Sequence, residues 1–252
     1  MDRKDFLRGL GLVGLGSVAM PILSSCSSDD DNSTNSSTTD NTEATDTGSN
    51  SGSTSCTVTA TETAGPFPTK SPSSLVKSDI TSDRTGVPLT INITIKNKNA
   101  SCAALEGALV DIWHCDKDGY YSEYGGTGMQ SADFTSVHFL RGRQTTNADG
   151  LVSFTSIFPG WYSGRATHIH VHIYSSSGTS LLVTQIAFPE GSGSAVVLVN
   201  ASTTNGYTKG MSGYTYNAND NVFSDGVSTE MSTVTGSVAT GFVLTHTINV
   251  AG

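Results

Sequence analysis

The fold and the chemistry of this chain are decided by the stretch Pro159-Gly160-Trp161-Tyr162-Ser163-Gly164-Arg165-Ala166-Thr167-His168-Ile169-His170-Val171-His172. Three histidines occupy alternate positions at its end, and the β-branched residues between them favour an extended strand. Successive side chains of a strand point to opposite faces, so all three imidazoles are expected on one face. Two imidazoles on one face can bind one metal ion, and Tyr162 lies close enough in sequence to add a phenolate oxygen.

The sequence around this stretch favours strands, because apolar and polar residues alternate and no helical period is evident. Residues 89–96 read Leu-Thr-Ile-Asn-Ile-Thr-Ile-Lys, which is typical of a half-buried strand. Strands are expected at residues 89–96, 108–113, 151–154, 167–173, 181–187, 195–199 and 242–250. Turn signals such as Asp149-Gly150 separate them, which predicts an all-β domain, a β-sandwich or a barrel. Residues 121–137 and 200–232 are expected to be long functional loops.

The first 25 residues are interpreted as a signal peptide. Arg3 and Lys4 precede an apolar, Gly-rich run at residues 7–23 that is too short to span a bilayer. Residues 23–26 read Leu-Ser-Ser-Cys, which resembles a bacterial lipobox and predicts that Cys26 is lipidated. The protein would then be exported and anchored to the cell envelope, at the periplasmic face or the cell surface. A plain cleaved signal peptide is the alternative.

Residues 26–55 are expected to form a disordered tether, since they are almost entirely Ser, Thr, Asn, Asp and Gly and cannot bury a core. The whole chain has a net charge of −9, of which the first 25 residues carry +1 and the tether −6. Residues 56–252, one domain, are therefore only mildly acidic, which gives no indication of nucleic-acid binding.

Three cysteines remain in the domain, at positions 56, 102 and 115. An oxidising compartment permits one disulfide with one cysteine left over. The pairing stays open, although Cys102 with Cys115 is disfavoured because the run between them is expected to be extended.

Three further motifs accompany the histidine stretch. They are Thr61-Glu62-Thr63-Ala64-Gly65-Pro66-Phe67, the segment 108–122 that ends in Asp-Gly-Tyr-Tyr-Ser, and the segment 139–150 that begins Phe-Leu-Arg-Gly-Arg-Gln. Together, and in this order, the four motifs resemble the intradiol ring-cleavage dioxygenases, the family of catechol 1,2-dioxygenase and protocatechuate 3,4-dioxygenase. The likeness runs from about Cys56 to the C-terminus, is nearest to the small secreted lipoprotein members, and implies a β-sandwich.

The resemblance implies a non-haem Fe(III) centre. Its ligands would be Tyr121, Tyr162, His168 and His170. This set is chemically suitable, because Fe(III) is a hard ion that favours anionic oxygen and imidazole, whereas zinc or Fe(II) more often takes three histidines or two histidines and a carboxylate. Arg165 and Gln185 would complete the site, the arginine by stabilising negative charge.

The implied activity is Fe(III)-dependent intradiol cleavage of a catechol-type aromatic diol by O₂ to a muconate-type diacid, with Tyr162 as a displaceable ligand and base. The alternative is a non-catalytic, tethered β-sandwich binding module whose histidines are structural or bind zinc. The colour of the pure protein would separate the two, because phenolate bound to Fe(III) is reddish. The identity of the catechol and the oligomeric state stay open.

The sequence also gives expectations for three other histidines and for the position of Arg165. His172 and His114 are expected to pack near the metal strand without binding, and His138 to lie on the surface. Arg165 is an odd number of residues from His168, so we expect a bend or bulge at residues 166–167 that turns its guanidinium into the pocket.

Overall fold

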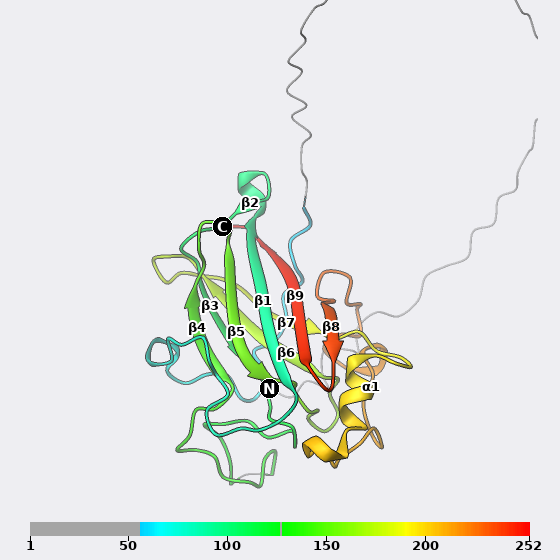
Figure 1. Cartoon of the computed structure of the whole chain (residues 1–252). Helices are drawn as coiled ribbons and strands as arrows, with labels where there is room; N and C mark the ends of the chain where they lie inside the picture. The colour runs from blue at the N-terminus through cyan, green and yellow to red at the C-terminus, as the bar shows by residue number, and fades with distance from the viewer. Residues whose placement is uncertain (1–55, 127) are drawn as a thin grey trace, which may run out of the picture. The chain divides into compact units, whose positions relative to one another are not determined.

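The computed structural model describes residues 56–126 and 128–252. The predicted signal peptide, the lipidation site Cys26 and the tether lie outside the described residues. The described chain folds mainly into strands, which form two sheets packed as a sandwich (Figure 1). No helix in this part of the chain is long and apolar enough to cross a membrane.

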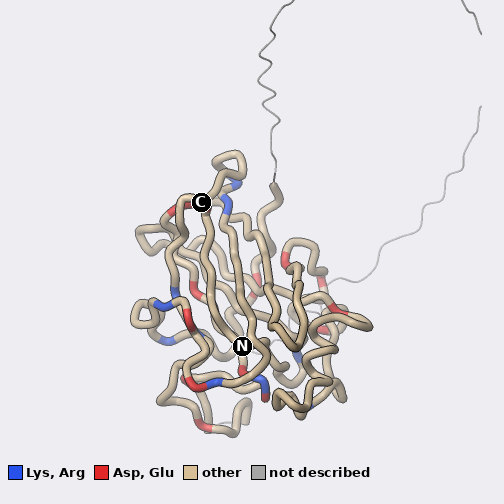
Figure 2. The backbone as a smooth tube through the Cα atoms, viewed as in Figure 1, with Lys and Arg blue, Asp and Glu red and all other residues tan. Residues whose placement is uncertain are grey.

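The first sheet has β1 at its centre and contains the only parallel pair of strands in the two sheets of the described chain. β1 pairs in parallel with β9 on one side, and antiparallel with β5 and the short β2 on the other; β8 pairs antiparallel with β9. Its strands are β1 (Pro88–Asn97), β2 (Ala103–Ala104), β5 (Leu151–Ile157), β8 (Thr233–Ser237) and β9 (Gly241–Val250). The outer face of this sheet carries mainly Thr, Ser and Asn, so the tube in Figure 2 is almost free of charged positions there.

The second sheet is antiparallel throughout and has the order β4-β3-β6-β7. Its strands are β3 (Leu109–Trp113), β4 (Arg141–Thr145), β6 (His168–Tyr174) and β7 (Ser180–Ala187). The strand with the three histidines, β6, is therefore a central strand with a neighbour on each side. Short helices occupy the loops: η1 (Pro72–Ser74), η2 (Lys98–Ala100), α1 (Ala195–Asn200), η3 (Thr203–Asn205) and η4 (Asn217–Asn219).

The core lies between the sheets and follows the alternation of the sequence. Leu89, Ile91, Ile93 and Ile95 on β1 are at most 1% exposed and pack against buried residues of the second sheet. On β6, Ile169, Val171 and Ile173 point into this core, so the histidines point to the opposite face of the sheet. Loops and the N-terminal segment cover that face over His168 and His170, which are 3% and 2% exposed.

Most of the expected strands are present, and one expectation is wrong. Residues 195–199 form the helix α1 instead of a strand, because the Ser194 side chain accepts a hydrogen bond from the backbone N–H of Val197 and caps its first turn. Val196 and Val199, one turn apart, face the core. The short β2, β4 and β8 lie outside the expected strands. The sequences of β4 and β8, Arg-Gly-Arg-Gln-Thr and Thr-Val-Thr-Gly-Ser, hold almost no apolar residues.

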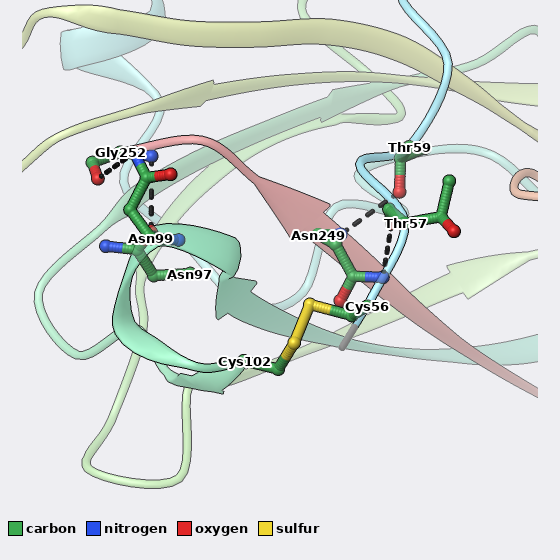
Figure 3. The surroundings of a disulfide bond; sticks show 8 residues. All are labelled: Cys56, Thr57, Thr59, Asn97, Asn99, Cys102, Asn249 and Gly252. Atoms are coloured by element: carbon green, nitrogen blue, oxygen red, sulfur yellow. Dashed lines mark hydrogen bonds between the residues drawn. A yellow bond between two sulfur atoms is a disulfide. The ribbon is translucent and has the colours of Figure 1, made fainter. Parts of the chain in front are cut away.

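The structure resolves the cysteine pairing that the sequence left open. Cys56 and Cys102 form a disulfide with their Cα atoms 5.9 Å apart, and Cys115 is buried with a free thiol. Beside the disulfide, the Asn249 side chain donates to the carbonyl oxygen of Thr57 (Figure 3). The disulfide therefore attaches the start of the described chain to the loop that follows β1.

Residues 56–69, here called the N-terminal strap, run from this disulfide to the covered face of β6. Thr59 exchanges hydrogen bonds with Asn249 on β9, and the N–H of Glu62 donates to the carbonyl oxygen of Val183 on β7. Near the other end of the strap, Phe67 is buried and its carbonyl oxygen accepts from Arg141. The strap thus joins both sheets and ends above the histidine strand.

Candidate metal centre

Two of the three β6 histidines are buried side by side in the form that binds metals. The Nδ1 atom of His168 lies 2.6 Å from the carbonyl oxygen of Ala166, which only accepts, so Nδ1 carries the proton and Nε2 presents a lone pair. Burial lowers the pKa of His168 to about 3 and that of His170 well below its ordinary value, which keeps both rings neutral. Trp113 stacks on the His170 ring at a centroid distance of 4.9 Å.

Three donor atoms converge at this point. The Tyr121 hydroxyl oxygen lies 3.1 Å from Nε2 of His168 and 3.4 Å from Nε2 of His170, and the two Nε2 atoms are 3.0 Å apart. Ligands bonded to one ion at about 2.1 Å have these separations when the angles at the ion are about 90–110°. The three side chains therefore fit a shared metal ion without rearrangement.

Tyr121 is the fixed member of the set. It is 2% exposed, and the Gln130 side chain accepts from its backbone N–H and donates to its carbonyl oxygen. Burial raises the pKa of the Tyr121 phenol well above its ordinary value, so without a cation the phenol keeps its proton. A bound metal ion reverses this preference and holds the oxygen as phenolate.

Tyr162 lies in the same pocket but is held differently. Its ring centroid is 6.2 Å from that of Tyr121, and Phe67 packs against both rings. The side chain is only half-buried, and its hydroxyl donates to the carbonyl oxygen of Met129 at 3.2 Å. The structure therefore brings the ring of the expected fourth ligand to the site, with its oxygen turned toward the pocket wall.

The pocket in front of these donors has a volume of about 380 Å³, which suits a substituted benzene ring. Pro66, Phe67, Met129 and Val222 give it apolar walls. The Tyr121, His168 and His170 side chains also line it. An aromatic ring can thus pack in the pocket with its polar groups toward the three donor atoms.

Arg165 reaches the pocket and is fixed at two of its three nitrogens. Its Nε lies 2.9 Å from both carboxylate oxygens of Asp220, and its Nη2 donates to Oε1 of Gln185 at 2.6 Å. Gln185 is itself held, because its Nε2 donates to the carbonyl oxygen of Thr63 in the strap. The remaining nitrogen, Nη1, has no hydrogen-bond partner among the described residues and is available to a ligand.

Of the bend or bulge expected at residues 166–167, the structure has a bend at Thr167 and no bulge. β6 begins at His168, and Arg165 precedes it in a turn in which its N–H donates to the carbonyl oxygen of Tyr162. Gly164 supplies a positive φ of 81° for this turn. The guanidinium therefore enters the pocket from the turn before the strand, and the regular alternation of β6 does not constrain it.

The remaining histidines lie outside the cluster of donor atoms. His172 is half-buried, with Nε2 2.8 Å from the Ser180 hydroxyl and Nδ1 2.8 Å from the Tyr174 hydroxyl. His114 is buried with Nε2 2.7 Å from the Ser156 hydroxyl. The half-exposed His138 pairs with Glu123.

Sequence reasoning missed Asp220. This fully buried carboxylate also accepts from the backbone N–H groups of Ala166 and Val222, so it connects the turn before β6 to a distant loop. No local signal marks it, because it is one acidic residue in a long polar segment, 55 residues from its arginine partner.

Known proteins resemble this chain in sequence. Residues 65–210 match a family model described as "Dioxygenase". The chain is 32% identical over 123 residues to catechol 1,2-dioxygenase 1 of Acinetobacter lwoffii, covering 42% of this chain and 37% of that protein. It is 29% identical over 143 residues to chlorocatechol 1,2-dioxygenase of Rhodococcus opacus, covering 49% and 51% respectively. The chain thus spans about half or less of the length of these two relatives.

A solved structure supports the same assignment at the level of the fold. The intradiol ring-cleavage dioxygenase from Tetranychus urticae superposes with a TM-score of 0.67 and 25% identity, covering 77% of this chain and 95% of that one. The sandwich fold is that of a ring-cleaving dioxygenase. The chain belongs to the intradiol ring-cleavage dioxygenase family.

Proposed function

We propose that the protein cleaves a catechol-type diol between its two hydroxylated carbons, inserting both atoms of O₂ to give a muconate-type diacid. The observation that carries the proposal is the convergence of the Tyr121 oxygen and the Nε2 atoms of His168 and His170 at the base of an aromatic-walled pocket. Family membership supports it.

Non-haem Fe(III) is the proposed cofactor, held by Tyr121, His168, His170 and, once its hydroxyl turns inward, Tyr162. Phenolate oxygen and imidazole nitrogen suit this hard ion, and no carboxylate or thiolate belongs to the donor set. When bound, Fe(III) supplies a Lewis-acid site for the deprotonated diol and a route for its electrons to O₂.

The two tyrosines have different roles in this proposal. Tyr121 is buried and its backbone is fixed by Gln130, so it stays in place. Tyr162 is half-buried with its hydroxyl toward the pocket wall, so it can turn away and take up a proton from a diol hydroxyl at its phenolate oxygen. The same side chain, Tyr162, would then both make room for the diol and accept its proton.

Arg165 and the pocket walls complete the site. The free Nη1 of Arg165 can donate to negative charge that develops on the diol oxygens or the ring, an effect that is strong in a pocket with little water. Pro66 and Phe67 give the pocket apolar walls against which the ring would pack. No external reductant is needed, because the diol itself supplies the electrons.

The test is made on the purified protein loaded with iron. We expect visible absorption from phenolate-to-Fe(III) charge transfer, and O₂ uptake with catechol that yields a muconate-type diacid. A colourless iron-loaded protein without O₂ uptake, or one that retains only zinc, would overturn the proposal in favour of the binding module.

Tyr162→Phe tests the role of the half-buried tyrosine. We expect the variant to keep some iron but to lose turnover by about 10²-fold or more, because the displaceable base is missing. Tyr216→Phe, at a tyrosine that is 43% exposed, is the control and should behave as wild type. Wild-type turnover in Tyr162→Phe with full iron loading would contradict the role.

We also propose that the domain is exported and lipid-anchored through Cys26. The Leu-Ser-Ser-Cys motif supports this, and the Cys56–Cys102 disulfide is compatible with an oxidising compartment. Mass spectrometry of the N-terminal peptide tests it, with Cys26→Ser as the control that cannot be acylated.

A further inference from the structure

A second hollow adjoins the active-site pocket. It has a volume of about 600 Å³ and shares two wall residues, Met129 and Tyr162, with the pocket of the donor atoms. The hydrogen bond from the Tyr162 hydroxyl to the Met129 carbonyl oxygen lies in this common wall. In the proposed function Tyr162 becomes a phenolate, which cannot donate this bond, so the wall between the two spaces is weakened when the site is active.

The lining of the second hollow differs in chemistry from that of the pocket. The pocket has apolar walls, whereas the residues lining the hollow include four with hydroxyl groups, Tyr120, Ser131, Ser163 and Thr208. They also include Asp118, whose carboxylate is paired with the ammonium of Lys117. None of these four hydroxyls has a hydrogen-bond partner among residues 56–126 and 128–252. Lys209 adds a positive charge, and its position is fixed because its ammonium donates to the Trp161 carbonyl oxygen and lies 3.6 Å from the centroid of the Trp161 ring.

We propose that this hollow is a subsite for an oxygen-rich substituent on the catechol ring, so that the preferred substrates are catechols with a polyhydroxylated or carboxylated side chain. The inference rests on the proposed function. The ring occupies the pocket, where the apolar walls pack against it and Arg165 is placed for the diol. The substituent crosses the Met129–Tyr162 wall to reach free hydroxyls and an ammonium, which replace the water that it loses on binding.

The experiment compares three ligands on the iron-loaded protein: catechol, ethyl caffeate and chlorogenic acid. The last two carry the same catechol ring, but the substituent is apolar in the ester and a polyhydroxylated acid in chlorogenic acid. Dissociation constants are measured by calorimetry without O₂, so that binding is read independently of turnover, and kcat/KM is then measured with O₂.

Thr208→Trp should fill the hollow, and Thr208 does not line the pocket of the donor atoms. Thr204→Trp is its matched control, because Thr204 is also an exposed threonine but lines a different hollow. We expect wild type and Thr204→Trp to bind chlorogenic acid about tenfold more tightly than ethyl caffeate, as two or so added hydrogen bonds would give. Thr208→Trp should lose this preference and bind catechol as wild type does.

Equal affinity of the wild type for the two caffeates would overturn the subsite, as would a parallel loss of all three ligands in Thr208→Trp. Selective binding of chlorogenic acid without any O₂ uptake would instead overturn the proposed function and leave the subsite standing. The subsite and the proposed function can therefore be rejected independently of each other.

Discussion

At position 65 the backbone has a φ of +68°, and a Cβ atom there would lie 3.0 Å from Cε1 of His170. The strap can approach the imidazole this closely only because the residue has no side chain. Gly65→Ala should displace the His170 ring and lower the affinity for iron by about tenfold, a typical result of disturbing a group that orients a ligand. Metal analysis after dialysis against a chelator measures it.

Gly126→Ala is the matched control for this change. Gly126 has nearly the same φ, +69°, but apart from its chain neighbours no atom of the described residues lies within 4 Å of the added Cβ. It therefore introduces the same backbone strain without the contact to His170. Equal loss of iron in both variants would show that strain alone is responsible.

The carboxylate of Asp220 directs the guanidinium of Arg165. In the wild type the Asp220 carboxylate accepts hydrogen bonds from Nε of Arg165 and from two backbone N–H groups. Asp220→Asn leaves only one acceptor oxygen for these three donors, so the Arg165 side chain should become mobile. We expect kcat to fall about 10–100-fold, as for a misplaced catalytic group, with unchanged iron content.

A double variant shows whether this effect passes through Arg165. Arg165→Lys alone loses the planar donor fork and should also lower kcat. If Asp220 acts by positioning Arg165, adding Asp220→Asn to Arg165→Lys lowers kcat little further. Additive losses would assign Asp220 to the stability of its loop instead.

Some parts of the site can be predicted from the sequence and others cannot. His168, His170 and Tyr162 stand in one short motif whose spacing and residue types indicate metal binding, whereas Tyr121 is assigned only through the resemblance to a family. Asp220 could not be predicted, because its role depends on a contact with Arg165 that only the folded chain creates. The orientation of the Tyr162 hydroxyl is also a property of packing, since it depends on the carbonyl of Met129.

At the scale of the element, the period of β6 places three histidines on one face, but the strap covers only the first part of the strand. We expect His168→Ala and His170→Ala to lose iron and His172→Ala to keep it, because His172 bonds to Ser180 and Tyr174. Iron analysis of the three purified variants decides the assignment. An iron-free His172 variant beside an iron-loaded His170 variant would reverse it.

The elements also show where a sequence pattern is sufficient. In β1 the alternation of Leu and Ile with polar residues predicts both the strand and its buried face, because one side packs on the core and the other meets water. In α1 a similar apolar, β-branched composition led to the wrong prediction of a strand, because six residues are too few to show a helical period. The cap at Ser194 favours the helix instead. β4 has no apolar pattern, since pairing with β3 and not burial of apolar side chains defines it.

At the scale of the whole molecule, the strap connects the disulfide at one end of the sandwich to the metal site. Its far end has attachments of its own: Gln185 donates to the carbonyl oxygen of Thr63, and Arg141 donates to that of Phe67. The sequence could not predict this path, because the residues of the strap have no strand pattern and the cysteine pairing was open. The disulfide should therefore stabilise the fold without directly holding the pocket.

Replacing both Cys56 and Cys102 with Ser tests this separation. The bond spans 46 residues, for which loop-closure entropy gives a loss of about 4 kcal/mol in the free energy of unfolding. We expect urea denaturation to show a loss of about 2–4 kcal/mol, and reduction of the wild type to give the same result. Iron content and colour should be retained at room temperature, because the contacts of Thr63 and Phe67 still hold the strap over His170. A folded double variant that loses its iron would show instead that tension from the disulfide end keeps the strap in place.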